Sequence, residues 1–477
     1  KPDGIMAIIL PHGVLFRGGE EGAIRRNLIE NDHLETIIGL PGNIFFGTGI
    51  PTIILVLRQK RKASDVLIVD ASRGFAKEGK NNKLRASDIK RIADTVIARS
   101  TVPGFSRLVP KTEIQEKEYN LNIPRYVDSS DPPETWDLYA SMFGGIPVSE
   151  LEPLAEFWKA FPTLRSALFT DNGTPYVAPK VENLALTVWE HPQVEKFRKQ
   201  CGDALSGFTP YLRGALLDQM LSLHIPRQEA LISEELFARI APLPLIDKYH
   251  AYQILDDHWQ PIAIDLEILQ TEGFEAARVV EPNLVTKKKE GKDVEVQEGW
   301  KGRILPFALV QSLHHADELE ALRSKETRLS EIAASIEEAL ENLSEEEKET
   351  ASSDELLNEE GDKFVPAALA KEAKRLQAGM LGTYAPETYE ARIVQVAEWQ
   401  AEEKTLKTAL KKATDALHLK TKKTIESLTD EQVRELLEAK WITPPLPLPL
   451  RPVHAANGPP DPQAGGPRGK ISPHLRR

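Results

Sequence analysis

Cysteine is nearly absent from this sequence, since Cys201 is the only one among 477 residues. An internal disulfide and a cysteine-rich zinc site are therefore excluded. The sequence fits a reducing, cytoplasmic setting best. It also has no apolar run as long as a membrane span and no secretory signal at its start. We therefore expect a globular protein without a membrane partner.

The sequence also has fewer basic than acidic residues, with 60 Lys and Arg and 72 Asp and Glu, so its formal net charge is −12. Such a chain is not a generic polyanion binder, so any nucleic-acid contact must be local or supplied by a partner. The histidines form no ligand set, because His314 and His315 have no second cluster nearby. Neither a metal site nor a Ser-His-Asp triad is predicted.

Four short apolar runs occupy the first 72 residues and predict buried strands. They are residues 4–11, 34–41, 51–59 and 64–72. Between the first two, Ile24, Leu28 and Ile29 recur at helical spacing, and residues 86–100 predict another helix. The pattern indicates an α/β layer, but one with only about half the strands of a usual doubly wound domain.

The rest of the chain predicts mostly helix. Residues 129–315 indicate mixed helices, with a short strand pair around 274–282 and a charged loop, "KKKEGKDVEVQEG", after it. Residues 316–443 predict long helices, since an apolar residue recurs there every seven positions. That stripe is Leu322, Leu329, Ile336 and Leu343.

A second stripe predicts a partner for the first long helix. It is formed by Trp399, Leu406, Leu410, Ala413 and Leu417. Residues 358–367 separate the two helical segments, which suggests an antiparallel hairpin that packs on itself or packs against a partner helix. Thr429 and Gln432 predict a capping box for a last helix.

These shifts in pattern divide the chain into four parts. We predict an α/β part at 1–128, a mainly helical domain at 129–315, a coiled-coil docking region at 316–443 and a tail at 444–477. The tail has ten prolines in 34 residues and little apolar content, so it is predicted to be disordered.

Two glycine-rich stretches resemble ligand loops. Gly47 and Gly49 follow a strand, as in a cofactor loop, but Ile50-Pro51 and an apolar strand come next instead of a helix. We interpret this stretch as a turn between two strands. "RGGEEG" (17–22) does precede a helix, but Glu20 and Glu21 already satisfy its dipole, so capping is the favoured interpretation.

Several blocks closely resemble the modification (methyltransferase) subunit of type I restriction-modification systems. They are residues 4–59, "FSRLVPKTEIQEKEYNLNIPRYVD" (105–128), "GGIPVSELEPLAEFWKAFP" (144–162) and "LTDEQVRELLEAKWI" (428–442). Together they extend over roughly residues 1–443.

The resemblance implies the late strands of a class I, Rossmann-like methyltransferase sheet, followed by helices. The family uses S-adenosylmethionine to methylate N6 of adenine in double-stranded DNA. It assembles with a DNA specificity subunit, against whose helices its C-terminal helices pack, and with a motor-nuclease restriction subunit. Its cofactor loop and its Asn-Pro-Pro-Phe catalytic loop precede the segment that begins here. We therefore expect a C-terminal fragment that is inactive alone and contains no catalytic or cofactor-binding residue that we can name.

One stretch of this chain matches the family's catalytic loop in part. Asp131-Pro132-Pro133 supplies its first three elements, but Glu134 stands where the aromatic residue belongs. We interpret this stretch as a proline-rich linker.

The resemblance also implies a target-base pocket at the turn within residues 34–58. In related adenine methyltransferases an aromatic side chain at this turn packs on the extruded base, and alignment places Phe46 there, with Phe45 as the alternative. The competing interpretation is that one of the two phenylalanines is core. Arg125 in "YNLNIPRYVD" is a candidate DNA phosphate contact. Against that stands a structural loop that ties the catalytic domain to its neighbour.

A second functional hypothesis is a non-enzymatic assembly subunit that docks a DNA specificity subunit through its helical region. Co-purification with that subunit, without methylation, would favour it. A helical adaptor unrelated to DNA is the weaker third hypothesis, because it leaves the strand-rich first 70 residues without a purpose.

Overall fold

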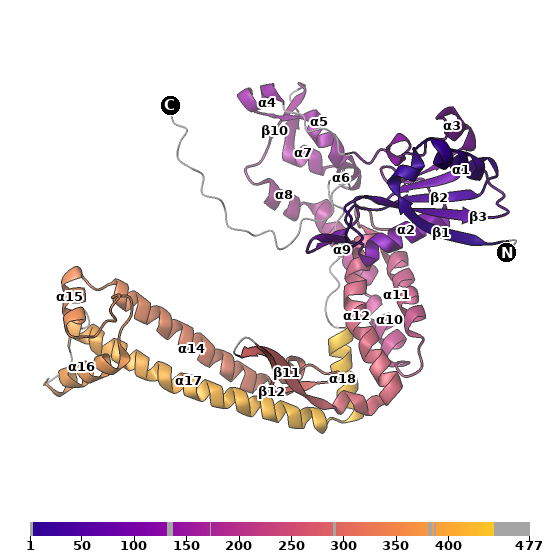
Figure 1. Ribbon diagram of the computed structural model, residues 1–477. Coiled ribbons are helices and arrows are strands. Elements are labelled where there is room, and N and C mark those ends of the chain that lie inside the picture. The colour runs from indigo at the N-terminus through magenta and orange to yellow at the C-terminus, as the bar shows by residue number, and fades with distance from the viewer. Residues whose placement is uncertain are drawn as a thin grey trace. The chain divides into compact units, whose positions relative to one another are not determined.

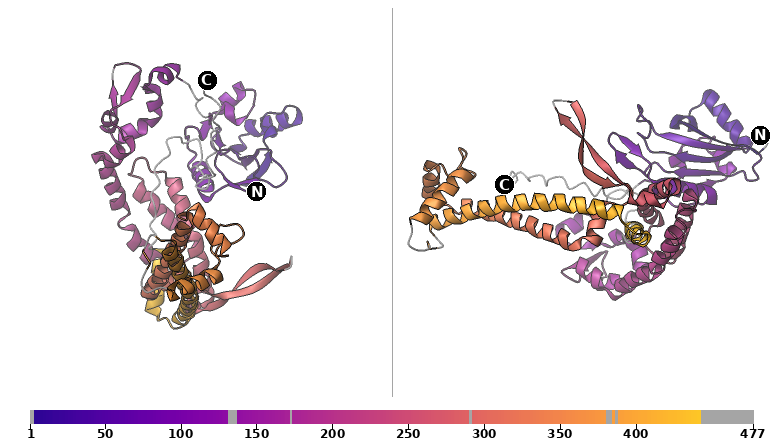
Figure 2. Two further views of the ribbon diagram at one scale, coloured as in Figure 1. Left: turned by 90° about the vertical axis from the view of Figure 1, so that its left-hand side faces the viewer. Right: turned by 90° about the horizontal axis from the view of Figure 1, so that it is seen from below.

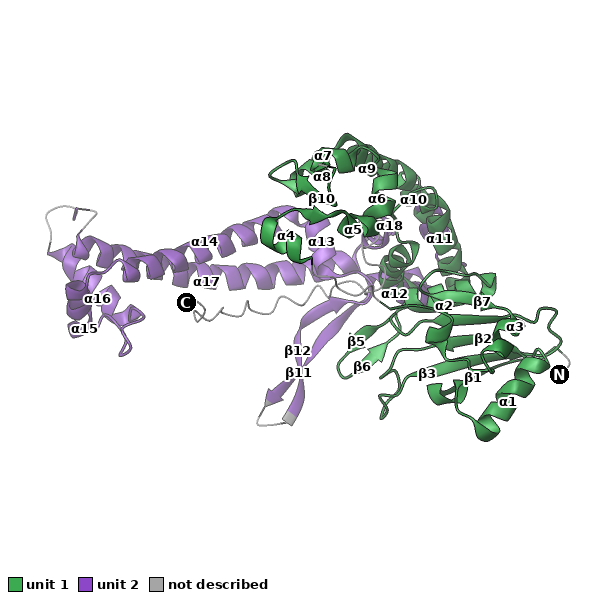
Figure 3. Cartoon of the chain, turned by 90° about the horizontal axis from the view of Figure 1, so that it is seen from above, with its two compact units in different colours: residues 1–212, 224–263, 445–477 green, residues 213–223, 264–444 purple. Residues whose placement is uncertain are grey.

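The computed structural model describes residues 3–130, 137–171, 173–289, 292–379, 384–385 and 388–442. The chain forms two compact units (Figure 3). The first contains residues 1–212 and 224–263, and the second contains residues 213–223 and 264–444. The domain boundaries predicted at 128, 315 and 443 stay predictions. Of the helices described, none combines the length and apolar character that crossing a membrane requires.

A five-stranded mixed sheet opens the first unit, in the order β1-β3-β2-β4-β7 (Figure 1). Its strands are β1 (Ile5–Pro11), β2 (Leu34–Gly39), β3 (Thr52–Arg58), β4 (Val66–Asp70) and β7 (Ser106–Val109). β2 and β4 are parallel, whereas β3 is antiparallel to both β1 and β2. All four predicted strands are confirmed. β7 was missed because its four residues are too few to show a period.

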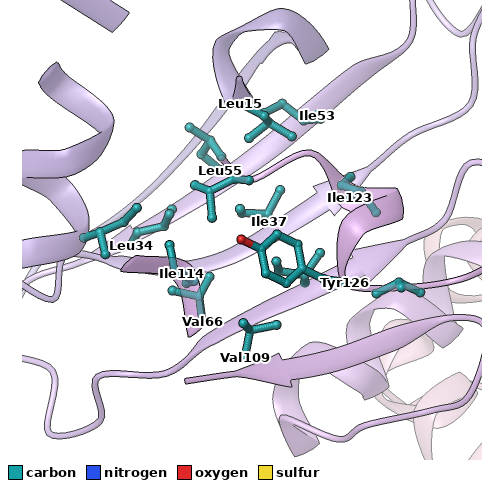
Figure 4. Close-up of a cluster of buried hydrophobic side chains, with 14 residues drawn as sticks. Leu15, Leu34, Ile37, Ile53, Leu55, Val66, Val109, Ile114, Ile123 and Tyr126 are labelled. Carbon is teal, nitrogen blue, oxygen red and sulfur yellow. The ribbon is translucent and has the colours of Figure 1, made fainter. Parts of the chain in front are cut away.

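Each face of this sheet packs against its own helices. Their bounds are α1 (Gly19–Glu30), α2 (Ala86–Ala98), α3 (Lys111–Glu116) and the 3-10 turns η1 (His12–Leu15) and η2 (Ile123–Arg125). One face buries Ile37, Ile53 and Leu55 against Ile114 and Tyr126 (Figure 4). The other face buries Ile38, Leu67 and Val69, with Ile92 of α2 packed against them. Alternate residues of β2, β3 and β4 thus fill two cores, as the two-residue period of a strand requires.

Strand β1 corrects one prediction, because we expected it to be buried. Ile5, Met6 and Ile9 are 57%, 51% and 52% exposed. β1 is the edge strand and pairs only with β3. Its apolar sequence therefore predicts a strand correctly, but the neighbours that would bury it are not among the described residues.

The remainder of the first unit is mainly helical, as predicted. Its elements are β5 (Ala76–Glu78), β6 (Asn81–Lys83), α4 (Leu138–Phe143), β8 (Ile146–Pro147), α5 (Val148–Leu151), η3 (Glu152–Leu154), α6 (Ala155–Ala160), α7 (Leu164–Leu168), β9 (Phe169–Asp171), β10 (Tyr176–Pro179), α8 (Leu184–Glu190), α9 (Pro192–Leu205), α10 (Phe208–Leu212), α11 (Ile225–Ile240) and the first part of α12 (Lys248–Glu272). The rest of α12, from Ile264 on, belongs to the second unit. A small core here is built around Phe161, Leu168, Phe197 and Leu245. The short sheet β8-β10-β9 was not foreseen.

The second unit contains a long two-stranded ribbon and helices. Its elements are η4 (Arg213–Leu217), η5 (Phe274–Arg278), β11 (Val280–Lys289), β12 (Lys292–Gly302), α13 (Phe307–His314), α14 (Ala316–Glu341), α15 (Glu345–Ser353), α16 (Pro366–Ala378), α17 (Tyr389–Glu426) and α18 (Asp430–Trp441). The predicted strand pair is present but begins at Val280, later than predicted, and the predicted charged loop after it is wrong. Residues 274–278 are a 3-10 helix, and most of the charged stretch lies in the ribbon that Figure 2 shows. A polar ribbon has no buried face, so its sequence lacks the apolar alternation that marks a strand.

Helices α14 and α17 lie side by side and antiparallel (Figures 1 and 3). Arg328 of α14 pairs with Glu402 of α17 at 2.8 Å, and Glu347 of α15 pairs with Arg392 of α17 at 2.8 Å. Residue numbers thus increase along α14 and α15 while those of their partners in α17 decrease, as in an antiparallel pair. Leu322 and Leu417 are buried. The hairpin prediction is confirmed in its self-packed form.

The predicted features at the ends of the long helices are also confirmed. Residues 358–364 interrupt the helices, and α15 and α16 flank this break. The Thr429–Gln432 capping box is present: the Gln432 backbone N–H donates to Thr429 Oγ1 at 3.3 Å, and the Thr429 N–H donates to Gln432 Oε1 at 2.9 Å. The predicted disordered tail lies outside the described residues.

His315 between α13 and α14 makes the stability of this unit depend on pH. It is buried, with Nε2 2.9 Å from Thr424 Oγ1, and among the described residues its Nδ1 has no hydrogen-bond partner. Burial lowers the pKa of His315 from its ordinary 6.5, Lys420 lowers it further, and Glu318 opposes them. The unfolded state therefore takes up the proton more readily. The contribution of neutral His315 is complete above the unfolded pKa and is lost as the pH falls below it.

We expect the free energy of unfolding of wild-type protein to fall between pH 7.5 and pH 5.5, and to fall less steeply in His315→Gln. Urea unfolding at several pH values measures both slopes. His258→Gln is the reference variant, because His258 is exposed on α12, and it should keep the wild-type slope. Equal slopes in wild type and His315→Gln would contradict this prediction.

Candidate target-base edge of the sheet

The carboxyl ends of β1, β2 and β4 lie at the same edge of the sheet, because these strands share one direction. The register places Pro11 opposite Thr52, and Gly39 opposite both Ile53 and Asp70. Residues 40–51, which connect β2 to β3, leave and re-enter the sheet at this edge. Ligands of open α/β sheets bind outside the carboxyl ends of the strands. This edge is therefore the candidate functional site.

The turn that carries Phe45 and Phe46 is built on glycine. Phe45 forms an isolated bridge with Thr48, and Gly47 has φ +81°, a conformation that glycine adopts without strain. Thr48 Oγ1 accepts a hydrogen bond from the Ile50 N–H at 3.3 Å. A strand follows the turn, so its interpretation as a turn between two strands is confirmed.

The two phenylalanines are both exposed. Phe46 is 92% and Phe45 39% exposed. The alternative that one of them belongs to the core is therefore wrong in this structure. Phe46 has nearly its whole ring in solvent, whereas Phe45 is partly covered.

The β5–β6 hairpin supports this connection through Asn82. Its Nδ2 donates to the Gly42 carbonyl at 2.7 Å, and its backbone N–H donates to the Asn43 carbonyl at 2.8 Å. A Cβ at Gly42 would lie only 2.9 Å from the Gly49 carbonyl oxygen, so the two limbs of the loop approach closely there. Sequence reasoning missed Asn82, because a single asparagine in a polar turn gives no signal of a contact 40 residues away.

Polar groups surround the end of β4. Asp70 is only 9% exposed. Its carboxylate accepts one hydrogen bond from Ser129 Oγ at 2.6 Å and another from the Ser72 N–H at 3.0 Å. Burial lowers the pKa of His12, and the charge of Asp70 opposes that shift, so His12 is mainly neutral at pH 7. Sequence reasoning did not connect Asp70 with Ser129 or His12.

The segment "YNLNIPRYVD" covers the sheet and exposes one arginine. Ile123 and Tyr126 are buried on the sheet, and burial raises the pKa of Tyr126 to about 12. At Gly39 a Cβ would lie 2.6 Å from Ile123 Cδ1, so a larger residue there would require the end of the Ile123 side chain to move. Arg125 is exposed, and its side chain lines an open cavity. The structural role belongs to the apolar residues and leaves Arg125 free for another role.

The remaining motifs contribute less. Glu20 and Glu21 lie in the first turn of α1, but its N-cap is Gly18 and has no side-chain capping bond, so the capping interpretation is corrected to a dipole interaction. Asp131, Pro132 and Pro133 lie outside the described residues. No group of three or more histidine, cysteine, aspartate or glutamate side chains that could hold a metal occurs in the described ranges.

S-adenosylmethionine does not fit the glycines of this edge. Gly47 and Gly49 lead into β3, so they do not present the amides of a helix N-terminus to a ligand. Within the described residues we therefore assign no cofactor ligand, and no chemical step is derived through the cofactor.

Comparison with known proteins relates this part of the chain to DNA methylases. The N-6 DNA Methylase family model matches residues 1–135. The methylase subunit of the type I restriction enzyme MpnII from Mycoplasma pneumoniae is 34% identical over 137 residues, which are 28% of this chain and 25% of that protein. The methylase subunit of MjaVII from Methanocaldococcus jannaschii is 34% identical over 159 residues, 32% of this chain and 28% of that protein.

One solved structure also matches part of the chain. The methyltransferase subunit of a type I restriction-modification system from Streptococcus thermophilus is 47% identical over the matched part, which is 27% of each chain, with a TM-score of 0.26. The chain thus spans about a quarter of the length of the curated relatives it matches.

Residues 1–135 of the chain thus match the N-6 DNA methylase family. The matched part of the chain is similar to the methylase subunits of type I restriction-modification systems. The family match covers the five-stranded sheet and the segment that packs on it, and so it includes the Phe45–Phe46 turn and Arg125.

Proposed function

We propose that this chain carries the target-base side of an adenine-N6 DNA methyltransferase, the modification subunit of a type I restriction-modification system. The sheet would be the late part of a class I, Rossmann-like methyltransferase sheet. The intact enzyme would transfer a methyl group from S-adenosylmethionine to N6 of a flipped adenine in double-stranded DNA. A DNA specificity subunit and a restriction subunit would be its partners.

The observation that carries this proposal is the exposure of Phe46 in a supported turn. An aromatic ring that is 92% exposed gains from contact with another apolar face. A flipped adenine has lost its stacking neighbours and offers that face. The hydrogen bonds from Asn82 to the base of the turn hold the backbone, so the ring is positioned before the base arrives. Phe45 is the second choice, because it is partly covered.

The test is binding of the purified chain to duplexes that contain 2-aminopurine opposite an abasic site. A base stacked on an aromatic side chain contributes about 1–3 kcal/mol, so Phe46→Ala should weaken binding by the corresponding factor of about 5 to 150. 2-Aminopurine fluorescence measures both the affinity and the environment of the base.

Phe143→Ala provides the matched control, because Phe143 is 69% exposed in the same unit but outside the turn. It should leave affinity unchanged, and Phe45→Ala should have the smaller effect of the two turn variants. Unchanged affinity and fluorescence in Phe46→Ala would refute the assignment of the base pocket to this ring.

The second candidate is a non-enzymatic subunit that docks a specificity subunit through its helices. The long helix α17 carries Leu419, which is 53% exposed and favours some contact there. The two predicted stripes do not add to it, because they face each other within the α14–α17 hairpin. Co-purification with a specificity subunit, lost in Leu419→Asp but kept in Phe46→Ala, would favour this role.

A further inference from the structure

An open cavity of about 750 Å³ lies between α1 and the segment that follows α3. Its polar lining includes Arg25, Arg26, Asn27, Lys117, Asn120 and Arg125. Phe16, Gly18 and Gly19 extend it toward the start of α1, and therefore toward the carboxyl end of β1. The methylase assignment uses none of these residues except Arg125.

Arg25 of α1 lines one wall of the cavity, and its guanidinium group is held there by hydrogen bonds to three backbone carbonyls. Its Nε donates to the Tyr119 carbonyl at 2.7 Å, and its Nη1 donates to the Val14 and Arg17 carbonyls at 2.7 and 3.0 Å. Glu118 and Tyr119 both have positive φ, 55° and 58°, which side-chain-bearing residues rarely adopt. The hydrogen bond from Arg25 to the Tyr119 carbonyl thus holds the backbone turn at Glu118 and Tyr119, and this turn belongs to the wall opposite α1.

Arg26 and Arg125 face this cavity with their charges uncompensated. Both are exposed, and within the described part of the chain neither makes an ion pair. Arg26 lies 4.6 Å from the centre of the Tyr119 ring, a contact that orients the guanidinium and leaves its donors available.

The other charged groups that line the cavity are mostly paired. Glu30 accepts from Tyr119 and Gln115 and lies 3.4 Å from Lys111, and Lys117 pairs with Glu113 at 2.9 Å. Glu118 is the opposing charge, because it is exposed and lines the same cavity. The balance of unpaired lining charge is therefore positive.

Both walls lead back to the candidate edge. η1 runs from the end of β1 to Phe16 at the rim of the cavity, and Ile123 packs at Gly39, two residues before Arg125. Two unpaired guanidinium groups thus lie in the same unit as the Phe46 turn. Guanidinium groups bind phosphate oxygens in bidentate geometry.

We propose that this cavity binds the DNA backbone, with Arg26 and Arg125 donating from its two walls to phosphodiester oxygens. The inference rests on the proposed function and adds the place where the duplex is held. It also assigns Arg25 as the positioning residue of the cavity and Glu118 as the charge that weakens binding there.

The test is the salt dependence of duplex DNA binding by the full chain, measured by fluorescence anisotropy of a labelled oligonucleotide. Each lost phosphate contact lowers the slope of log K against log salt by about one. We therefore expect a slope reduction of about one for Arg26→Gln or Arg125→Gln, and about two for the double variant. Glu118→Gln should tighten binding, and Arg125→Lys should retain most of the slope.

Arg227→Gln is the matched control, since Arg227 is exposed in the same unit and does not line the cavity. It should keep the wild-type slope. A wild-type slope in the double variant would overturn the proposal, and so would tighter arginine-dependent binding of RNA or of an acidic peptide than of duplex DNA.

The two proposals fail in different ways. If the cavity proposal alone fails, the double variant keeps its salt slope while Phe46→Ala still loses the 2-aminopurine signal. If the proposed function alone fails, the arginine variants change the slope while Phe46→Ala binds like wild type.

Discussion

Replacing Asp265 by alanine is expected to lower the free energy of unfolding of the second unit by about 3–5 kcal/mol. Asp265 in α12 is 5% exposed, and its Oδ2 accepts from Lys440 Nζ at 2.5 Å and from Trp441 Nε1 at 2.8 Å. Lys440 also donates to the Ile304 carbonyl at 2.6 Å. One carboxylate therefore joins the end of α18 to α12. Its removal leaves an ammonium and an indole N–H without their acceptor in a largely buried place.

Hydrogen exchange of the α18 amides and urea unfolding measure this effect. Asp415→Ala is the matched control, because Asp415 is exposed on α17, and we expect a change within about 0.5 kcal/mol. The double variant Asp265→Leu with Lys440→Met should be less destabilised than Asp265→Ala, since it removes both charges together. Equal protection of α18 in wild type and Asp265→Ala would show that the pair does not stabilise this helix.

Lysine at Ile5 and Ile9 is expected to suppress self-association of the purified chain. Both side chains lie on the same face of β1, four residues apart along the strand, and both are more than half exposed. An exposed apolar edge strand pairs readily with another chain, and lysine on such an edge opposes that pairing. Wild-type protein should form concentration-dependent oligomers, and Ile5→Lys with Ile9→Lys should remain monomeric.

Sedimentation velocity at several concentrations measures the association, and circular dichroism reports the fold. Because the two isoleucines are already exposed, the double variant should lose little stability. Ile53→Lys is the contrasting variant, since Ile53 is fully buried in the neighbouring strand, and it should unfold the sheet. Oligomers of unchanged size in the double lysine variant would show that association uses another surface.

The candidate site could be predicted in part, because its elements leave different marks on the sequence. The Phe45–Phe46 turn was identified since glycine and proline punctuate two strongly apolar strands. Asn82, Ser129 and His12 were not connected with it, because their contacts join residues that are far apart along the chain. Arg125 was singled out, but Arg26 was not, since a charged residue on an ordinary helix carries no mark of the cavity that it faces.

The sequence by itself determined the local elements whose signal repeats within one segment. The strands β1 to β4 follow from runs of isoleucine, leucine and valine, the helices α14 and α17 from their heptads, and the start of α18 from a capping box. Each depends on backbone preference and on which positions are apolar, and both are properties of a short stretch of chain.

Only the tertiary structure decided which of these elements cover one another. It left β1 exposed, paired the two heptad stripes within one hairpin, turned the charged stretch of 287–299 largely into a ribbon, and placed Arg26 opposite Arg125. The physical reason is that burial and charge pairing depend on neighbours distant in the chain. A periodic pattern specifies that a face will be buried, but not which other segment buries it.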